Sequence, residues 1–311
     1  MTGAVAGAVT PAVTPAAASG GLCIVLGNGP SLKGFDFARL DGVASLGMNA
    51  AYRYWDQIGW YPTYYACLDD QLIQTHHQRI YDMWREGRIR HFFLQGDFFA
   101  LHPDCVGAPG MLSLDQVIPY LFELRGRGQG WDPVDHPAFR TADQNKITTG
   151  AYALRFAAWL GHDRLGVAGV DLRYVEILPE AERTEGVGLK MRATPTSNPN
   201  YFFDDYQRAG DTYNIPNPDQ HDNRLHIDSF RVLMQDFAAN GVPARLVNTN
   251  PDSVLEQEKV MPLWPMERLL APAGLAAVAV PTNRHEIGAI LDNFRLWADP
   301  GHAPWRSPPP P

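Results

Sequence analysis

The first apolar stretch of the chain ends in residues that could hold an anionic ligand. Residues Leu22–Leu26 lead directly into a short loop made of Gly27, Asn28, Gly29, Pro30 and Ser31. Glycine lets another group approach the backbone closely, because it has no Cβ. Backbone N–H groups and a serine hydroxyl are donors that can hold a phosphate or a ribose. The loop is therefore a candidate nucleotide-binding loop, although it lacks the third glycine of the dinucleotide fingerprint.

Polar residues also follow three other apolar stretches. Asn49, Asp69, Asp171 and Arg173 each stand close to the end of one of them. Taken singly, such residues are more typical of turns and helix caps than of ligand contacts. The carboxyl ends of parallel strands, however, meet at one edge of a sheet, and ligands bind there in this class of fold. Together with the glycine loop, these residues favour a binding site at that edge.

A second anion-binding element is predicted at residues 146–152, which read KITTGAY. Thr148 or Thr149 is a natural N-cap for the helix that follows, and Gly150 falls in its first turn. A helix N-terminus carries partial positive charge, and Lys146 adds a full charge beside it. The alternative interpretation is that the two hydroxyls only cap the helix.

Short apolar stretches alternate with helical patterns along the middle of the chain. The predicted strands are 22–26, 43–48, 64–68, 91–94, 165–170 and 244–247, and the predicted helices are 71–86, 149–160 and 226–240. This alternation predicts an α/β, Rossmann-like fold, with a mainly parallel sheet and helices on both faces. Such a sheet would bring the polar strand ends together.

The composition indicates a globular protein without a general affinity for nucleic acid. The 311 residues are 45% hydrophobic and 19% charged, and the net charge is −8, whereas a nucleic-acid binder would show a basic surface. Cys23, Cys67 and Cys105 lack the spacing of a metal site and favour buried, reduced thiols. Because no stretch has the length of a membrane span, we expect a cytoplasmic protein, with peripheral attachment at the inner face of the membrane as an alternative.

The two ends differ in composition from the middle of the chain. Residues 1–20 are rich in Ala, Val, Thr and Pro, lack Lys and Arg, and are predicted to form a disordered tail. Residues 21–260 are expected to form one nucleotide-binding domain. Residues 261–311, which end in SPPPP, indicate a C-terminal extension or linker.

Two motifs resemble a known family. VLGNGPSL, then Asn49, then ITTGAYALRFAAWLGHDRLGVAGVDLRY are similar to glycosyltransferase family 42, the bacterial lipooligosaccharide sialyltransferases. They are also similar to related domains of flagellin-modifying glycosyltransferases and of archaeal hydroxymethylpterin pyrophosphokinases. The resemblance covers roughly residues 22–256. It implies a GT-A-variant nucleotide-binding fold with a lid, inverting transfer from CMP-sialic acid, and no metal or other cofactor.

The resemblance also implies roles for single residues. The matches to the family's nucleotide loop and to a neighbouring asparagine are Gly27, Asn28, Gly29, Ser31 and Asn49. Thr148, Thr149 and Gly150 match a Thr-Ser-Gly that holds the donor, including its sugar carboxylate. Asp171 matches an aspartate at the cytidine site. A lid is expected at about residues 173–221, an irregular segment rich in tyrosines, among which Tyr206 and Tyr213 are candidates to contact the leaving phosphate.

A catalytic histidine follows the lid in the family. Alignment of the last helix and strand places His221 at that position. A histidine with a pKa near neutrality suits a base that takes a proton from the acceptor hydroxyl. His226 is the second candidate, although its position favours a role in opening the helix.

Three positions depart from the family. Lys146 replaces an arginine, Arg173 replaces a phosphate-binding tyrosine, and Asp69 replaces an asparagine near the sugar carboxylate. An ionised Asp69 would repel a sugar carboxylate unless Lys146 or Arg173 neutralises it. Sialic acid, another nonulosonic acid and Kdo therefore all stay open as the activated sugar.

The sequence thus predicts a metal-independent inverting glycosyltransferase that uses a CMP-activated sugar. Its expected acceptor is a glycan or lipid-linked glycan of a bacterial surface polysaccharide. One alternative is a diphosphokinase-type nucleotide enzyme in which Asp69 holds Mg²⁺. The other is a non-catalytic nucleotide-binding domain of a larger polysaccharide-synthesis protein. Assembly into a homo-oligomer stays open.

Overall fold

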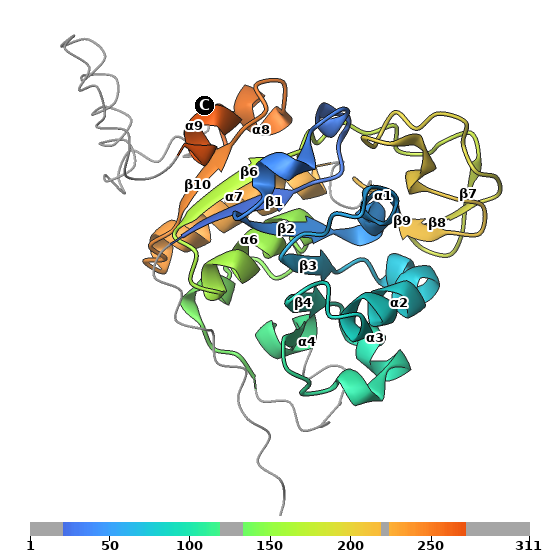
Figure 1. Ribbon diagram of the computed structural model, residues 1–311, viewed down its shortest axis with the longest axis horizontal. Helices are drawn as coiled ribbons and strands as arrows, with labels where there is room; N and C mark the ends of the chain where they lie inside the picture. The colour runs from blue at the N-terminus through green and yellow to red at the C-terminus, as the bar shows by residue number, and fades with distance from the viewer. Residues whose placement is uncertain (1–20, 119–132, 219–223, 272–311) are drawn as a thin grey trace, which may run out of the picture. The chain divides into compact units, whose positions relative to one another are not determined.

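A seven-stranded parallel sheet forms the centre of the fold. The computed structural model describes residues 21–118, 133–218 and 224–271. The strand order is β10-β6-β1-β2-β3-β4-β5, and all neighbouring strands are parallel (Figure 1). The strands are β1 (Leu22–Leu26), β2 (Ala44–Met48), β3 (Tyr64–Cys67), β4 (His91–Leu94), β5 (Met111–Ser113), β6 (Arg164–Ala168) and β10 (Arg245–Asn248). The chain builds outward from β1 in both directions, which makes the crevice between β1 and β6 a topological switch point, where ligands bind in such sheets.

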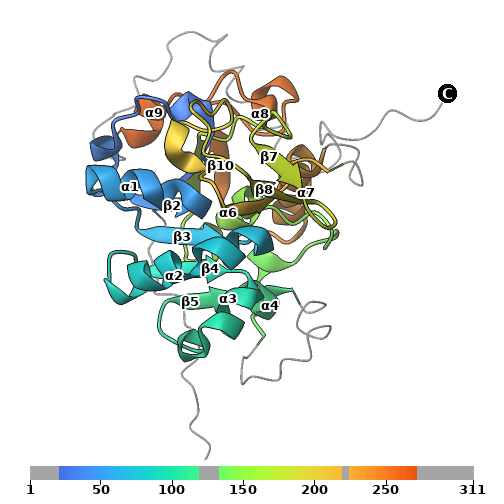
Figure 2. The same ribbon diagram turned by 90° about the vertical axis from the view of Figure 1, so that its right-hand side faces the viewer.

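Helices cover both faces of this sheet, as predicted (Figure 2). Neighbouring residues of a strand point to opposite faces. In β3, the ring of Tyr64 meets Phe156 of α6, whereas the ring of Tyr65 meets Trp55 of α1. The described α-helices are α1 (Tyr52–Ile58), α2 (Asp70–Arg85), α3 (Gly96–Leu101), α4 (Leu114–Val117), α6 (Thr149–Trp159), α7 (Leu225–Ala239), α8 (Val254–Gln257) and α9 (Met266–Leu270). The α/β class is therefore confirmed.

The predicted elements agree with the structure where the sequence pattern was long. All six predicted strands and all three predicted helices are present, with no end displaced by more than two residues. The strand predicted at 165–170 ends at Ala168, because Gly169 takes the left-handed conformation with φ +68°. Strand β5 and helix α1 were missed, since three and seven residues are too few for a periodic pattern to emerge.

Helices α6 and α7 are tied together at two levels on one face of the sheet. Arg155 of α6 donates to Asp236 of α7 at 2.5 Å, and these side chains are only 1% and 5% exposed. Nearer the N-terminal ends, the hydroxyls of Thr148 and Ser229 are 2.7 Å apart. The two helices therefore begin side by side, at the edge of the sheet where the predicted site lies.

A segment of irregular chain and short strands follows β6, and we call residues 173–218 the cover. It contains a three-stranded antiparallel sheet of β7 (Ala181–Arg183), β8 (Gly188–Met191) and β9 (Thr212–Asn214). The expectation of a lid without regular elements was wrong in this respect. Its polar, turn-rich sequence hid strands of three or four residues, which gain their pairing partners only from elsewhere in the cover.

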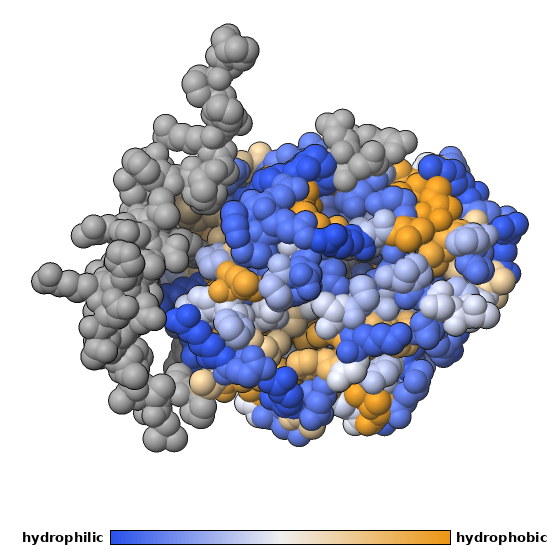
Figure 3. Space-filling view, turned by 90° about the horizontal axis from the view of Figure 1, so that it is seen from above, coloured by the Kyte–Doolittle hydropathy of each residue, from blue (hydrophilic) through white to orange (hydrophobic). Residues whose placement is uncertain are grey.

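The three cysteines are free and buried, as expected, and burial raises the pKa of each thiol. Viewed from above, the described surface is mostly hydrophilic, with hydrophobic residues in small separate groups (Figure 3). Within the described ranges, no helix has the length and apolar character needed to cross a bilayer. By its internal contacts the chain divides into residues 1–264 and 265–311, and the features below all lie in the first unit.

Candidate functional site

A cavity of about 220 Å³ lies at the carboxyl ends of β1, β2, β3 and β6 and is bordered by the cover. Most residues predicted to bind the ligand line this cavity, although they come from segments far apart in the chain. They are Gly27, Asn28, Gly29, Asn49, Asp69, Thr148, Thr149, Gly150, Asp171, Arg173, Tyr206 and Tyr213. The topology therefore brings the polar strand ends together, as the sequence predicted.

Three of the predicted residues are not found in the cavity lining. Ser31 follows the glycine loop, but its hydroxyl donates to Asp171. The Nζ atom of Lys146 lies 3.5 Å from Asp228 Oδ2, so its charge is paired with α7. His221, the predicted base, lies outside the described residues.

The two glycines of the first loop serve a contact between two loops. Gly27 N donates to the Ala168 carbonyl at 2.7 Å, and Gly29 N donates to the Gly169 carbonyl at 2.8 Å. A Cβ atom on Gly27 would lie 2.3 Å from the oxygen of Gly169. The loops after β1 and β6 thus pack backbone against backbone. The expectation that these amides are left free for a phosphate was wrong, because they are already used.

Asp171 fixes the same loop from the other side. Its carboxylate accepts from Ser31 N at 2.8 Å, from Ser31 Oγ at 2.5 Å and from Asn250 Nδ2 at 2.7 Å. The residue is only 7% exposed. Its three donors replace the hydrogen bonds to water that the carboxylate loses on burial. Asp171 therefore shapes the wall of the cavity, with both oxygens already engaged.

Two amide oxygens at the cavity have no partner. Asn28 Oδ1 and Asn49 Oδ1 are both buried, and neither accepts a hydrogen bond from the residues that the structure describes. The other end of Asn28 is held, since its Nδ2 donates to Met48 O at 3.3 Å and to the Tyr206 hydroxyl at 2.9 Å. Asn49 has φ +55°, in the left-handed region. A ligand with O–H or N–H donors would satisfy both oxygens.

The N-terminus of α6 opens into the cavity. Of the two predicted N-cap candidates, Thr148 is the N-cap, and its hydroxyl accepts from Ala151 N at 3.4 Å. The hydroxyl of Thr149 accepts from Leu68 N at 3.3 Å, which ties the helix to the end of β3. The first amides of a helix have no partner within the helix, and its N-terminus favours negative charge. This is the part of the cavity best suited to an anion.

Asp69 caps a helix, as is typical of its sequence position, and it also binds the cover, which the sequence did not indicate. It is the N-cap of α2, accepting from Gln71 N and Leu72 N, and it also accepts from the backbone and side-chain amides of Asn214 in the cover. Burial raises its pKa to about 6, and the N–H donors oppose that shift. Each oxygen faces N–H groups, so Asp69 joins α2 to the cover instead of presenting a free carboxylate to a ligand.

Tyrosines of the cover form the opposite wall. The rings of Tyr201 and Tyr206 stack with centroids 3.6 Å apart, and burial raises the pKa of both phenols. The Tyr206 hydroxyl accepts from Asn28 Nδ2 and, at 3.3 Å, from Ala50 N. The hydroxyl accepts two hydrogen bonds and stays protonated, so its own hydrogen remains available to donate to a ligand in the cavity. Tyr213 instead donates to the sulfur of Met191 at 3.5 Å.

His226 lines the cavity near the start of α7. Its ring lies 5.2 Å from that of Tyr174, and Ser229 Oγ donates to its carbonyl at 2.7 Å. Burial lowers its pKa to about 4, and the hydrogen bond that its ring donates to the Pro216 carbonyl opposes that shift. It is therefore neutral near pH 7 and able to accept a proton.

Tyr174 and Tyr201, which the sequence also offers at a strand end and in the predicted lid, line the cavity. Two further lining residues, Asn200 and Asn214, were not singled out from the sequence. Asn200 pins one end of the cover by accepting from Val175 N and donating to Val175 O. Asparagines in a turn-rich stretch are common, so no local signal distinguished these from ordinary turn residues.

Across the described ranges, no group of three or more His, Cys, Asp or Glu side chains is arranged to hold a metal ion.

No protein-family model and no curated protein matches this chain. Several solved structures resemble it, and two of them are sialyltransferases. One is a variant of the sialyltransferase Cst-II in complex with CMP, with 16% identity, a TM-score of 0.41, and coverage of 79% of this chain and 86% of that chain. The other is the sialyltransferase CstII from Campylobacter jejuni in complex with cytidine-5′-monophosphate as a substrate analogue, with 15% identity, a TM-score of 0.40, and coverage of 79% and 85%. At this identity and overlap, neither likeness identifies the family or the ligand of this chain.

Proposed function

We propose that the cavity binds the CMP part of a CMP-activated sugar and that the protein is an inverting glycosyltransferase. The observation that carries the proposal is the meeting of an anion-favouring helix N-terminus with two unpaired amide oxygens. The start of α6 suits a phosphate. The free Oδ1 atoms of Asn28 and Asn49 suit ribose hydroxyls or the amine of a base. A nucleotide offers an anion and such donors at once.

The choice of cytidine over other bases, and of a sugar donor, is supported by the sequence resemblance stated above. In the chemistry we infer, the acceptor hydroxyl attacks the anomeric carbon, the bond from that carbon to the phosphate oxygen breaks, and CMP leaves with the electron pair. The charge that develops on the phosphate would be stabilised by the Tyr206 O–H, Arg173 and the start of α6. No step of this scheme uses a metal ion.

A base must take the proton of the acceptor hydroxyl. His221 is our first candidate, from the sequence resemblance, and His226 is the second, because it lines the cavity and is neutral near pH 7. The acceptor is inferred to be a glycan or lipid-linked glycan of a bacterial surface. This assignment comes from the sequence resemblance.

The sugar of the donor is inferred to be acidic: sialic acid, another nonulosonic acid or Kdo. Arg173 is the only lysine or arginine among the described residues that line the cavity. Its Nη2 donates to the Asp252 carbonyl at 3.1 Å, and it is exposed. The repulsion expected from Asp69 is reduced, because its oxygens face N–H donors of α2 and Asn214. A sugar carboxylate would rely on Arg173 and the start of α6.

Thermal-shift measurements with CMP, UMP, GMP and ATP, each with and without Mg²⁺, test this proposal. CMP without metal should stabilise the protein by about 2.7 kcal/mol at a hundredfold excess over Kd. A shift with ATP and Mg²⁺ alone would instead favour the diphosphokinase-type enzyme. Binding of CMP without transfer from any CMP-sugar would favour a non-catalytic domain.

Asn28→Ala shows whether the binding occurs in this cavity. The variant should weaken CMP binding more than it lowers Tm, because one side-chain oxygen of Asn28 is unpaired without a ligand. Asn240→Ala is the matched control, since Asn240 also donates two amide hydrogen bonds but lies at the far end of α7. Early unfolding of Asn28→Ala with unchanged CMP affinity would show that Asn28 is only a structural turn residue.

A further inference from the structure

The cover is attached to the rest of its unit by side-chain contacts of three kinds, besides a backbone hydrogen bond from Phe202 N to the Asn28 carbonyl at 3.1 Å. Phe202 and Phe203 pack against the ring of Tyr54 in α1, with centroids 5.1 and 5.3 Å away. Asn214 forms the polar contact with Asp69 described above. The third contact is ionic and joins Arg53 of α1 to Asp211, which itself lines the cavity.

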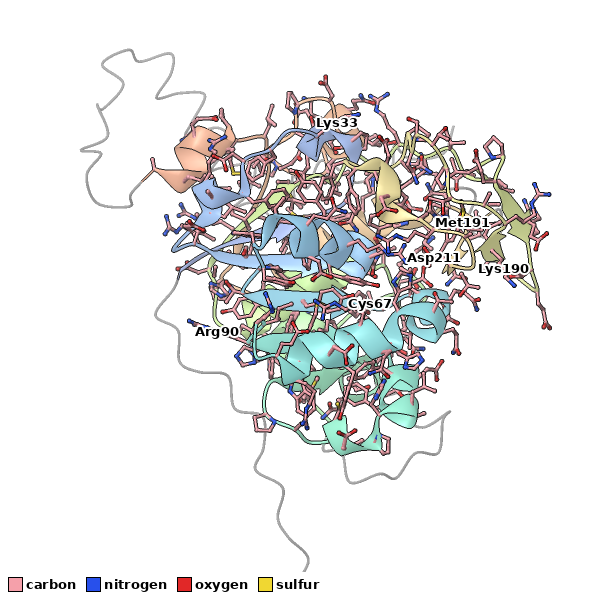
Figure 4. The ribbon with its side chains drawn as sticks, turned by 45° about the vertical axis from the view of Figure 1, so that its right-hand side comes forward. Lys33, Cys67, Arg90, Lys190, Met191 and Asp211 are labelled. Carbon is pink, nitrogen blue, oxygen red and sulfur yellow. The ribbon has the colours of Figure 1, made fainter. Side chains whose placement is uncertain are left out.

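Arg53 reaches two different groups of the cover. Its Nη1 and Nη2 atoms donate to the two carboxylate oxygens of Asp211 at 2.5 and 2.9 Å. Nη1 also donates to the carbonyl of Tyr206 at 2.8 Å. The two charged side chains are only 11% and 10% exposed, so water screens them little. Figure 4 shows Asp211 where the cover meets the N-terminal elements, whereas Lys190 lies at its outer edge.

The surroundings of Asp211 leave Arg53 as the partner that balances its charge. Arg208 contributes a backbone N–H at 2.7 Å from Oδ2. His76 Nε2 lies 3.6 Å from Oδ1, beyond hydrogen-bond distance, and His76 Nδ1 is 2.6 Å from the hydroxyl of Tyr52. Burial lowers the pKa of His76 to about 4, so this ring is neutral near pH 7.

Tyr206 is the cavity residue on which these contacts converge. Its carbonyl is held by Arg53, and its hydroxyl accepts from Asn28 Nδ2 and Ala50 N. We propose that Arg53 is a positioning residue of the cavity. By holding Asp211 and the Tyr206 carbonyl together, it keeps the Tyr206 hydroxyl between Asn28 and Ala50 with its proton free for a ligand. An effect of Arg53 on ligand affinity rests on the proposed function, whereas its effect on the position of Tyr206 does not.

Hydrogen exchange of the Ala50 amide in the ligand-free full chain tests the placement directly, because this amide donates to the Tyr206 hydroxyl. Arg53→Lys keeps the charge opposite Asp211 and is expected to fold, but one ammonium group cannot replace the three contacts of the guanidinium. Both Arg53→Lys and Tyr206→Phe should raise the exchange rate of Ala50 about tenfold. The matched control is Arg79→Ala, because the side-chain hydrogen bonds and ion pairs of Arg79 in the described part of the chain go to Asp56, Tyr61 and Glu86 and not to the cover.

The rate for Arg79→Ala should equal that of the wild type. Unchanged Ala50 exchange in Arg53→Lys, or an equal increase in Arg79→Ala, overturns the inference.

A double-mutant cycle on CMP affinity tests whether Arg53 acts through Tyr206. Arg53→Lys should weaken binding about fivefold in the wild type and not at all in the Tyr206→Phe background. Losses that add fully would show that Arg53 acts by another route and would overturn the inference. If the wild type binds no CMP, the proposed function fails, and the exchange of Ala50 still decides the role of Arg53.

Discussion

The two walls of the cavity are built in different ways. The strand-end wall consists of the loops after β1 and β6, which are joined by backbone hydrogen bonds and by the carboxylate of Asp171. The cover reaches the rest of the unit mainly through side chains, with Arg53–Asp211, Asp69–Asn214 and the rings around Tyr54 as its main contacts. One backbone hydrogen bond, from Phe202 N to the Asn28 carbonyl at 3.1 Å, also joins it to the strand-end wall.

This difference shows how one cavity can combine a rigid and an adjustable side. Backbone contacts at glycines allow almost no displacement, because neighbouring atoms are already at contact distance. Side-chain contacts between segments distant in sequence can break one at a time. We therefore expect changes in the strand-end wall to alter stability, and changes in the cover to alter local motion and ligand affinity.

The largest effect is expected from loss of the base that takes the proton of the acceptor hydroxyl. His221→Ala should lower transfer about 10²- to 10⁴-fold and leave CMP binding intact, because a base touches the acceptor. The pH–rate profile of the wild type should lose activity below about pH 6.5, the ordinary pKa of histidine. Three results together would assign the base to His226 instead. The wild-type rate would fall only near pH 4, His221→Ala would transfer at a near-normal rate, and His226→Gln would lose most activity.

A smaller but still large effect is expected in the strand-end wall from Asp171→Ala. The substitution leaves the donors of Ser31 and Asn250 without their acceptor, which should cost about 3 kcal/mol of unfolding free energy. The control is Asp205→Ala in the cover, which removes an exposed pair with Arg208 and should cost less than about 1 kcal/mol. Urea denaturation measures both. Equal losses would contradict the distinction between the walls.

Gly27→Ala probes the close approach of the two loops. The added Cβ would meet the Gly169 carbonyl at 2.3 Å, and relief of that overlap should cost about 2–3 kcal/mol. Gly186→Ala in the cover is the comparison, because a Cβ there meets nothing within 4 Å and only the φ of +65° opposes it. That variant should lose about 1 kcal/mol. A Gly27→Ala protein as stable as the wild type would show that the loops can separate without cost.

The smallest effect expected is a local response of the cover to pH. Burial lowers the pKa of His76 and His226 to about 4 from 6.5, so opening becomes easier as the pH falls from 6.5 to 4. Asp69 acts in the opposite direction and offsets one of the two histidines. Its pKa is raised from 3.8 to about 6, so its protonation between pH 6 and 4 favours the closed, buried state. Opening of the cover therefore takes up about one proton in total, so the free energy of opening should fall by about 1 kcal/mol per pH unit between pH 6 and 4.

This response must be measured locally, because burial also lowers the pKa of four further histidines, His91, His102, His136 and His162. Hydrogen exchange of residues 198–214 at pH 7, 6 and 5 provides the measurement. Protection should fall towards pH 5 after correction for intrinsic rates, and it should fall less in His226→Gln. Protection that rises towards pH 5 would show that Asp69 dominates the pH response of the cover.

The sequence by itself determined the parallel sheet, its central helices and the edge at which polar residues gather. These features follow from local patterns: apolar runs of strand length, helical periodicity, and a threonine before the helix at Thr149. The predicted N-cap and most of the predicted cavity residues could be named because each lies at the end of such a run.

Only the tertiary structure decided what those residues do there. Gly27 and Gly29 pack on the loop after β6, Asp171 clamps Ser31, and Asp69 joins α2 to the cover. Arg53 and Asp211 stand 158 positions apart, and nothing near either one in the sequence indicates the other. The physical reason is that periodicity reports local conformation, whereas the pairing of a buried donor with an acceptor is settled only when distant segments meet and exclude water.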